Sequence, residues 1–260
     1  MDKLIIKNLT KSFDGTGVLH NVSFTVRDGE FLSILGPSGC GKTTILRILI
    51  GLESADSGEI IKDGVNITTL PAAKRKMGIV FQNYALFENM TVLRNVEYAL
   101  LKSAGTKGEY SRKKAAAKAK EMLELVGLSE HLDKKPRQLS GGQQQRVAIA
   151  RTLALNPDVI LFDEPMSALD VDTRLSLRAE LKELQKRFGT TMIYITHDQE
   201  EAYALSDRIM VMDAGVIHQL DTPHNLIDRP ADDYVRNFVI RNINIKINSL
   251  IQFARLEDNK

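Results

Sequence analysis

The chain has 260 residues, of which 43% are hydrophobic and 26% are charged, as in ordinary water-soluble globular proteins. Its 35 Lys and Arg nearly balance 33 Asp and Glu, so the sequence gives no strongly basic surface and does not favour nucleic acid as a partner. No apolar run approaches the roughly 20 residues needed to cross a bilayer, the first nine residues lack a signal-peptide core, and the single cysteine fits a reducing cytosol.

The first part of the chain is expected to be rich in strands. Residues 4–6 and 22–26 predict two short strands joined through a turn around Asp14 and Gly15. Phe13 precedes this turn, and the sequence leaves two interpretations open: an exposed ring that stacks on a nucleobase, or a core phenylalanine. Residues 57–62 predict a further strand that ends in a turn.

Residues 36–44 read Gly-Pro-Ser-Gly-Cys-Gly-Lys-Thr-Thr and fit the phosphate-loop pattern. An apolar run at 31–35 predicts a buried strand before the loop, and apolar residues at helical spacing after it predict a helix. In this context glycines let backbone N–H groups surround phosphate oxygens at the positive end of the helix. Lys42 is expected to reach the β- and γ-phosphates, and the Thr43 hydroxyl to ligate Mg²⁺. The sequence therefore predicts a nucleoside triphosphate site.

Cys40 lies inside this loop. Because a thiol near a helix N-terminus tends to have a lowered pKa, we expect maleimide labelling of Cys40 to inhibit ATP hydrolysis and ATP to protect against it.

Residues 79–81 predict a short strand, which Gln82 follows at once. Gln82 is either a solvated loop residue or a side chain whose amide oxygen reaches a metal or water near the phosphates. From about residue 90 to 135 the chain becomes rich in Lys and Ala with amphipathic helical spacing. We interpret this part as a helical insertion, and its charges as a solvated helix face rather than a nucleic-acid patch.

A second glycine-rich stretch, Leu-Ser-Gly-Gly-Gln at 139–143, precedes an apolar helix. Ser140 is a good helix cap, and Gly141 and Gly142 are expected to leave the N–H groups of the first turn bare, which would make a second anion site. A single compact domain rarely needs two such sites for one phosphate group. Two copies of the chain facing each other would use both.

A continuous apolar run at 159–162 predicts a central parallel strand, and it ends in Asp163 and Glu164. Carboxylates at this end of a strand lie where α/β sheets bind ligands. Asp163 is expected to support the Mg²⁺ shell, and Glu164 to take a proton from an attacking water. The next buried strand, at 192–196, is followed by His197, which is thereby placed to touch a γ-phosphate, although a lone histidine is most often structural.

These motifs, in this order, resemble the ATP-binding subunit of ABC transporters over nearly the whole chain. The Leu-Ser-Gly-Gly-Gln stretch is highly specific to that family, whereas the phosphate loop alone is not. The loop and residues 196–202, Thr-His-Asp-Gln-Glu-Glu-Ala, are similar to bacterial binding-protein-dependent importers of maltose, spermidine/putrescine, sulfate, ferric iron or phosphonates.

The resemblance implies an α/β fold, a P-loop NTPase of the ABC-ATPase type. It has a mixed central sheet, an antiparallel β subdomain and a helical subdomain. The ATPase domain would span residues 1–240, with the helical subdomain inserted at about 90–155. Residues 241–260 would be a tail without the full regulatory domain that such importers often carry.

The resemblance also assigns roles to residues of the site, with ATP and Mg²⁺ as cofactors. Glu164 matches the general base, His197 the γ-phosphate switch and Gln82 the sensor of Mg²⁺ and water, while Lys42 stabilises charge. The metal ligands would be Thr43, Gln82 and Asp163. The residues expected to bind the nucleotide are Phe13, Gly36, Pro37, Ser38, Gly39, Cys40, Gly41, Lys42, Thr43, Thr44, Ser140, Gly141, Gly142, Gln143 and Asp170.

The partners implied are a second copy in a head-to-tail dimer with ATP at the interface, two transmembrane permease subunits and, indirectly, an extracytoplasmic solute-binding protein. The protein would lie on the cytoplasmic face of the cell membrane and energise solute import by hydrolysing ATP. Two alternatives stay open: a soluble ABC-type ATPase that acts on nucleic acid or ribosomes, and the ATPase of an exporter.

Overall fold

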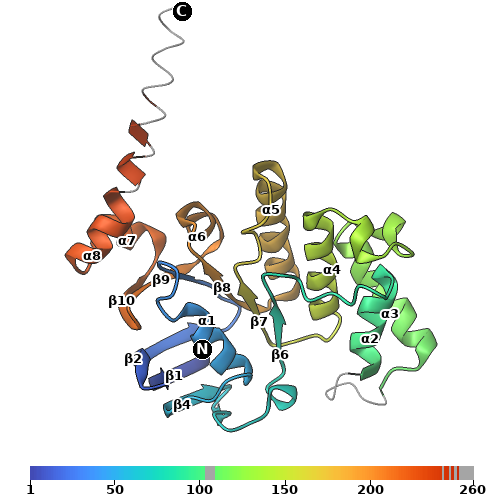
Figure 1. The fold of residues 1–260 in the computed structure, drawn as a ribbon, viewed down its shortest axis with the longest axis horizontal. Helices are drawn as coiled ribbons and strands as arrows, with labels where there is room; N and C mark the ends of the chain where they lie inside the picture. The colour runs from blue at the N-terminus through green and yellow to red at the C-terminus, as the bar shows by residue number, and fades with distance from the viewer. Residues whose placement is uncertain (103–108, 242, 246, 249–250, 252–260) are drawn as a thin grey trace, which may run out of the picture.

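The computed structural model describes residues 1–102, 109–241, 243–245, 247–248 and 251 (Figure 1). The expected helical insertion and the expected tail from 241 to 260 both include positions outside these residues, 103–108 in the first case and most of 249–260 in the second.

A six-stranded sheet forms the centre of the molecule, in the order β10-β9-β3-β8-β7-β6. Five of its strands are parallel, and β10 joins the edge in the antiparallel direction. Since parallel strands end at a common edge, the residues that follow β3, β7 and β8 are brought together there. The strands are β3 (Phe31–Leu35), β6 (Met77–Val80), β7 (Val159–Asp163), β8 (Thr191–Thr196), β9 (Arg208–Asp213) and β10 (Val216–Asp221).

Successive side chains of the buried strands enter two separate cores. In β7, Ile160 and Phe162 belong to one core, while Leu161 belongs to the other. The period of two residues along a strand causes this alternation, and it explains why these strands read as unbroken apolar runs. The first core is covered by α4 (Gly141–Leu153) and α5 (Val171–Phe188), and the second by α1 (Lys42–Ile50) and a second sheet.

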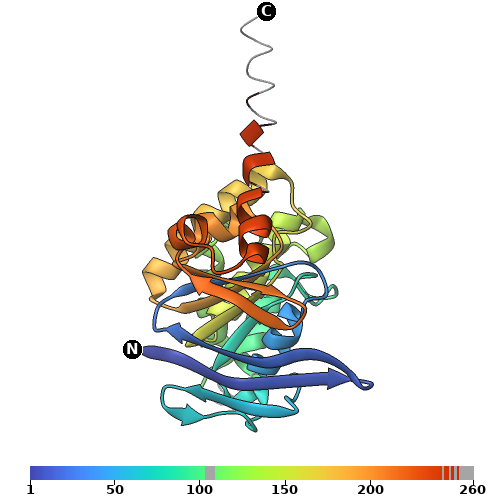
Figure 2. The ribbon, with the colours of Figure 1, turned by 90° about the vertical axis from the view of Figure 1, so that its left-hand side faces the viewer.

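The second sheet is antiparallel, in the order β2-β1-β4-β5, and lies beneath the central sheet (Figure 2). Its first two strands are longer than the runs at 4–6 and 22–26, because pairing continues past register shifts that interrupt the apolar alternation. Leu9 and Val22, for example, are paired beyond one such shift and are both buried. The strands are β1 (Asp2–Phe13), β2 (Thr16–Arg27), β4 (Ser57–Lys62) and β5 (Val65–Asn66).

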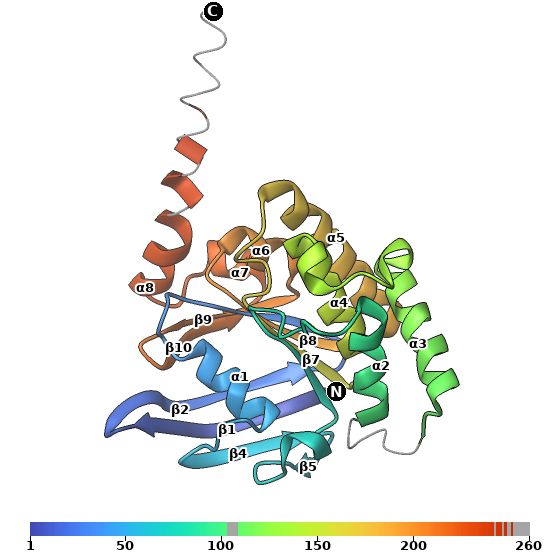
Figure 3. The same ribbon diagram turned by 45° about the vertical axis from the view of Figure 1, so that its right-hand side comes forward.

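Helices α2 (Val92–Lys102) and α3 (Arg112–Leu125) pack with α4 at one end of the molecule (Figure 3). Ser111 caps α3 by accepting a hydrogen bond from the Lys114 N–H. Short 3₁₀ turns at Ala72–Lys74, Ser129–His131 and Pro136–Gln138 connect the elements.

The last helical segments lie on the side of the molecule away from α2 and α3, and α6 (Gln199–Leu205) lies between them and α5 (Figure 1). They are α7 (Pro223–Asp228), α8 (Asp233–Val235) and a π-helical turn (Arg236–Arg241). The Gln199 side chain donates to the Phe238 carbonyl and ties α6 to this final segment. None of the described helices has both the length and the apolar character that a bilayer crossing requires.

Candidate functional site

The loop between β3 and α1 is shaped by close backbone packing. A Cβ at Gly36 would lie 2.3 Å from the Met212 carbonyl oxygen, so only glycine fits there. Gly41 forms the N-cap of α1 with a φ of 102° and offers no side-chain bond to the first turn. The N-terminal N–H groups of α1 are thus not capped by a side chain and face the loop, the arrangement that phosphate oxygens require.

Lys42 reaches back into this loop. It is only 4% exposed, and its Nζ donates to the carbonyl oxygens of Gly36 and Pro37, both at 2.8 Å. These bonds hold the ammonium group inside the curve of the loop, where it can pair with an entering anion.

The expected lowering of the Cys40 thiol pKa is wrong. The side chain is buried, and this burial raises the pKa of the thiol, although the nearby Lys42 charge acts in the opposite direction. Cys40 fills space beneath the loop, since a Cβ at Gly36 would lie 2.9 Å from its Sγ. The helix N-terminus, which is the sequence signal for a low pKa, is outweighed by desolvation.

Thr43 and Asp163 meet although 120 positions separate them in the sequence. The Thr43 hydroxyl donates to Asp163 Oδ1 at 3.0 Å. Burial raises the pKa of Asp163, the neighbouring Glu164 charge adds to the increase, and the Thr43 bond opposes it. A half-buried carboxylate beside a hydroxyl at the mouth of a phosphate loop matches the oxygen ligands that Mg²⁺ prefers.

Glu164 and His197 stand together at the same edge. The Nδ1 of His197 lies 3.0 Å from Oε2 of Glu164, and their side chains are 54% and 19% exposed. Glu164 has a φ of 45°, a left-handed conformation that is unusual for this residue, and its N–H donates to the Ile195 carbonyl of the neighbouring β8. The backbone of the next strand therefore turns this carboxylate toward the histidine and the solvent.

Gln82 is connected to the same edge through Ser167. Its Nε2 donates to the Ser167 hydroxyl at 3.2 Å, and that hydroxyl donates to the Glu164 carbonyl at 3.0 Å. The structure thus brings together Lys42, Thr43, Gln82, Asp163, Glu164 and His197. Among the described residues, no cluster of three or more His, Cys, Asp or Glu side chains is placed to hold a metal ion by itself.

The second glycine-rich stretch forms the N-terminus of α4. Ser140 is the cap, as expected, and its hydroxyl accepts from the Gln143 N–H at 3.3 Å while the Gln143 side chain accepts from the Ser140 N–H at 3.0 Å. This capping box satisfies part of the first turn, so the expectation of wholly bare N–H groups is wrong for Gln143. A Cβ at Gly142 would lie 2.4 Å from the Thr173 methyl group, which shows how closely α4 approaches α5.

Asp170 caps the neighbouring helix α5. It accepts from the Thr173 N–H at 2.9 Å and from the Thr173 hydroxyl at 2.7 Å, and these bonds lower the pKa of its carboxyl group. Because α5 packs beside α4, the two N-cap residues Asp170 and Ser140 lie at the N-termini of neighbouring helices. No hydrogen bond or ion pair within the described chain joins either of them to the Lys42 group.

Phe13 ends β1 with its side chain exposed, at 42%, and the Lys11 ammonium lies 4.8 Å from the ring centroid. Of the two interpretations that the sequence left open, the structure therefore agrees with the exposed ring rather than a core phenylalanine.

Sequence reasoning missed the side chains that support these loops. Arg151 of α4 donates to the carbonyls of Tyr84 and Ala85, at 2.9 and 2.7 Å, and both of these residues have positive φ. Arg174 of α5 and the buried Glu201 of α6 were also missed. No local motif marks them, because their partners come from other elements; only the stretch at 196–202 pointed to the neighbourhood of Glu201.

A phosphate loop before α1, with an acidic pair and a histidine at the ends of the neighbouring strands, defines an α/β nucleotide-binding cassette. The family model described as ABC transporter matches residues 19–167, and the chain belongs to that family.

Several relatives agree with this assignment. The spermidine/putrescine import ATP-binding protein PotA of Oleidesulfovibrio alaskensis is 48% identical over 90% of this chain, and the sn-glycerol-3-phosphate import ATP-binding protein UgpC of Ruegeria sp. is 46% identical over 92%. The chain spans 61% of the length of the first and 67% of the second. The solved dimeric cassette MJ0796 bound to ADP and Pi has a TM-score of 0.75 and 36% identity, covering 84% of this chain and 98% of that one.

Proposed function

We propose that this chain binds and hydrolyses ATP as the ATP-binding subunit of a membrane importer. The observation that carries the proposal is the gathering of Lys42, the Thr43–Asp163 pair and the Glu164–His197 pair at one sheet edge. The structure with ADP and Pi, at 36% identity, supports the nucleotide, and the names of the relatives support import.

In this proposal each side chain has one task. Lys42 neutralises charge on the β- and γ-phosphates, Glu164 accepts a proton from the attacking water, and His197 contacts the γ-phosphate while the Glu164 carboxylate orients its ring. Mg²⁺ would be held by Thr43 and Asp163, with Gln82 nearby, and would supply positive charge to the phosphate oxygens. Phe13 would stack on the adenine ring.

The working form in this proposal is a head-to-tail dimer. In the described part of the chain no hydrogen bond or ion pair joins residues 140–143 or Asp170 to Lys42, and these residues would instead cover the nucleotide held by a second copy. The dimeric state of the MJ0796 cassette supports this arrangement.

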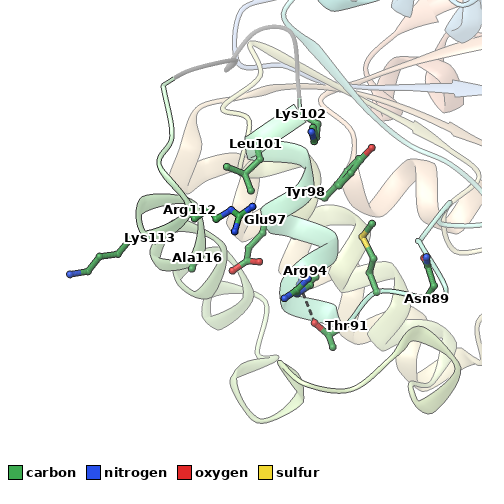
Figure 4. A pocket seen from close by; sticks show the side chains of 11 residues that line it. Asn89, Thr91, Arg94, Glu97, Tyr98, Leu101, Lys102, Arg112, Lys113 and Ala116 are labelled. Atoms are coloured by element: carbon green, nitrogen blue, oxygen red, sulfur yellow. Dashed lines mark hydrogen bonds between the residues drawn. The ribbon is translucent and has the colours of Figure 1, made fainter.

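The permease surface would be the groove between α2 and α3, which has a volume of about 970 Å³ (Figure 4). Met90, Tyr98 and Leu101 give it an apolar lining, and Arg94, Lys102, Arg112 and Lys113 outnumber the single acid, Glu97. An amphipathic permease segment with an acidic side chain fits this surface, and docking there would place the protein at the cytoplasmic face of the cell membrane. Tyr98 is 38% exposed in this groove, and changing it to Glu should abolish co-purification with the permeases and leave the basal ATPase of the chain intact.

The solute is specified elsewhere in this proposal. Relatives named for a polyamine cation and for a phosphate ester anion have nearly the same identity to this chain, 48% and 46%. Solutes of opposite charge are thus compatible with one cassette sequence, so a binding protein and permeases would select them.

The test of the proposed function is the change Glu164→Gln, with Glu183→Gln, an exposed acid on α5, as the matched control. Loss of the general base should reduce turnover by about 10²-fold or more, leave ATP binding unchanged and trap an ATP-bound dimer. The control should behave as wild type. A Glu164→Gln protein that turns over ATP at the normal rate would refute the role of this carboxylate.

A further inference from the structure

Arg174 joins two loops: one ends at Asp170, and the other begins at His197. It lies on α5, four residues after Asp170. Its Nη2 donates to the Leu169 carbonyl at 3.1 Å, and its Nη1 donates to Asp198 Oδ2 at 3.2 Å. Leu169 directly precedes Asp170, and Asp198 directly follows His197. One guanidinium group is therefore bonded next to both functional side chains.

Glu201 holds this guanidinium from behind. Its side chain is about 5% exposed, and its Oε2 accepts from the Tyr194 hydroxyl at 2.8 Å and from the Thr196 hydroxyl at 2.7 Å. Its Oε1 lies 3.7 Å from Arg174 Nε, a buried atom without a hydrogen-bond partner in the described structure. Burial of a carboxylate is costly unless a cation is near, so Glu201 and Arg174 depend on each other.

Asp198 has two separate tasks. Its Oδ1 caps α6 by accepting from the N–H groups of Glu200 and Glu201, at 2.8 and 3.4 Å, while its Oδ2 is the acceptor for Arg174. Thr196 adds a third link, because its hydroxyl also accepts from the Asp198 N–H at 2.9 Å. The backbone around His197 is thus fixed from both sides.

We propose that Arg174, supported by Glu201, is a positioning residue that holds the Asp170 loop and the His197 loop in one fixed relation. The contact of His197 with a γ-phosphate and the contact of Asp170 with a second copy would then form together. The planar fork of arginine directs two separate nitrogens at the two loops, a fixed geometry that the single nitrogen of lysine does not reproduce. This inference rests on the ATP hydrolysis proposed above.

The test begins with hydrogen exchange of the 260-residue chain, a measurement that needs no catalysis. Arg174→Lys and Arg174→Gln should increase amide exchange in both segments, 167–173 and 197–202. Arg187→Gln is the matched control, because Arg187 is an exposed arginine near the far end of the same helix. Increased amide exchange in only one of these segments, or in neither, would overturn the proposal that Arg174 holds the two loops together.

Steady-state ATP hydrolysis then separates positioning from a purely structural role. We expect both Arg174 variants to lower kcat by roughly ten- to a hundredfold, because small displacements of catalytic groups are costly, and to change the KM for ATP by less than about twofold. Asp198→Ser keeps an oxygen for the α6 cap but removes the acceptor of Arg174. The double variant with Arg174→Gln and Asp198→Ser should lose no more kcat than the single variant that loses more.

The outcomes distinguish this inference from the function on which it rests. Additive effects of the two changes, or a kcat within twofold of wild type, would overturn the inference while ATP hydrolysis stands. A second outcome is that the Arg174 variants show increased exchange in both segments while the wild type fails to hydrolyse ATP. That outcome would support the link that Arg174 makes between the two loops and overturn the proposed function.

Discussion

The N-termini of α1 and α4 both follow glycine-rich loops, but their first turns are completed differently. At α1 the cap is Gly41, no side chain bonds the first turn, and Lys42 is buried within the loop. At α4 Ser140 and Gln143 bond each other's backbone; Ser140 is exposed and Gln143 is half-buried. The first site is shaped by its own chain. The second is stable while exposed, as expected of a surface that a second copy covers.

The largest effect is expected from adding a side chain to the loop before α1. Gly36→Ala would place a methyl group 2.3 Å from a backbone oxygen. We expect a loss of about 1–3 kcal/mol in the free energy of unfolding, with loss of ATP binding. Gly39→Ala, in the same loop, meets no atom within 4 Å and should cost only the strain of its positive φ, about 1 kcal/mol. Denaturant unfolding measures both, and equal losses would contradict the packing argument.

The α4 cap can be compared with the cap of α3, although only α4 has the reciprocal side-chain bond of a capping box. The Oγ of Ser140 and that of Ser111 each accept a backbone N–H at 3.3 Å. Ser140→Ala and Ser111→Ala should each cost about 1 kcal/mol of stability. Only Ser140→Ala should weaken ATP-dependent dimerisation, as seen by sedimentation. If Ser111→Ala weakens it equally, the effect belongs to helix stability and not to a contact with the nucleotide.

Asp163, beside the phosphate loop, should make the stability of the folded chain depend on pH. Burial raises its pKa in the folded state, so the ionised carboxylate destabilises the protein. This destabilisation is absent below the unfolded pKa and fully present once the pH exceeds the folded pKa. Asp163→Asn retains an acceptor for Thr43, and it should raise the melting temperature at pH 7 but not near pH 3. A variant less stable than wild type at pH 7 would contradict this sign.

The smallest effect is expected at Cys40. Because burial raises its thiol pKa, the thiolate fraction at pH 7 is lower than that of a free cysteine. Maleimide labelling of the folded chain should therefore be slow, rise with pH and become fast only on unfolding in urea. Rapid labelling at pH 7 that ATP prevents would restore the opposite expectation.

Local patterns in the sequence predicted most elements and much of the site. The phosphate-loop motif located Lys42 and Thr43, and the carboxyl-end rule for parallel strands brought Asp163, Glu164 and His197 to the same edge. The confirmed fold class followed from the same motifs. What the sequence could not give depends on contacts between distant elements. Three features leave no periodic or local signal in the sequence. They are the register shifts within the β1–β2 pair, the burial that raises the pKa of Cys40 where a lowered pKa was expected, and the pairing of Arg174 with Glu201.

If each nucleotide lies between Lys42 of one chain and Ser140 of another, two variants that are each defective should complement each other when mixed. In a Glu164→Gln background, one protein carries Lys42→Ala and the other Ser140→Arg. Neither alone can complete a site, whereas a mixed dimer retains one. With ATP, we expect light scattering to find twice the single-chain mass of 29.0 kDa only in the mixture. A dimer of either variant alone, or single chains in the mixture, would contradict this expectation.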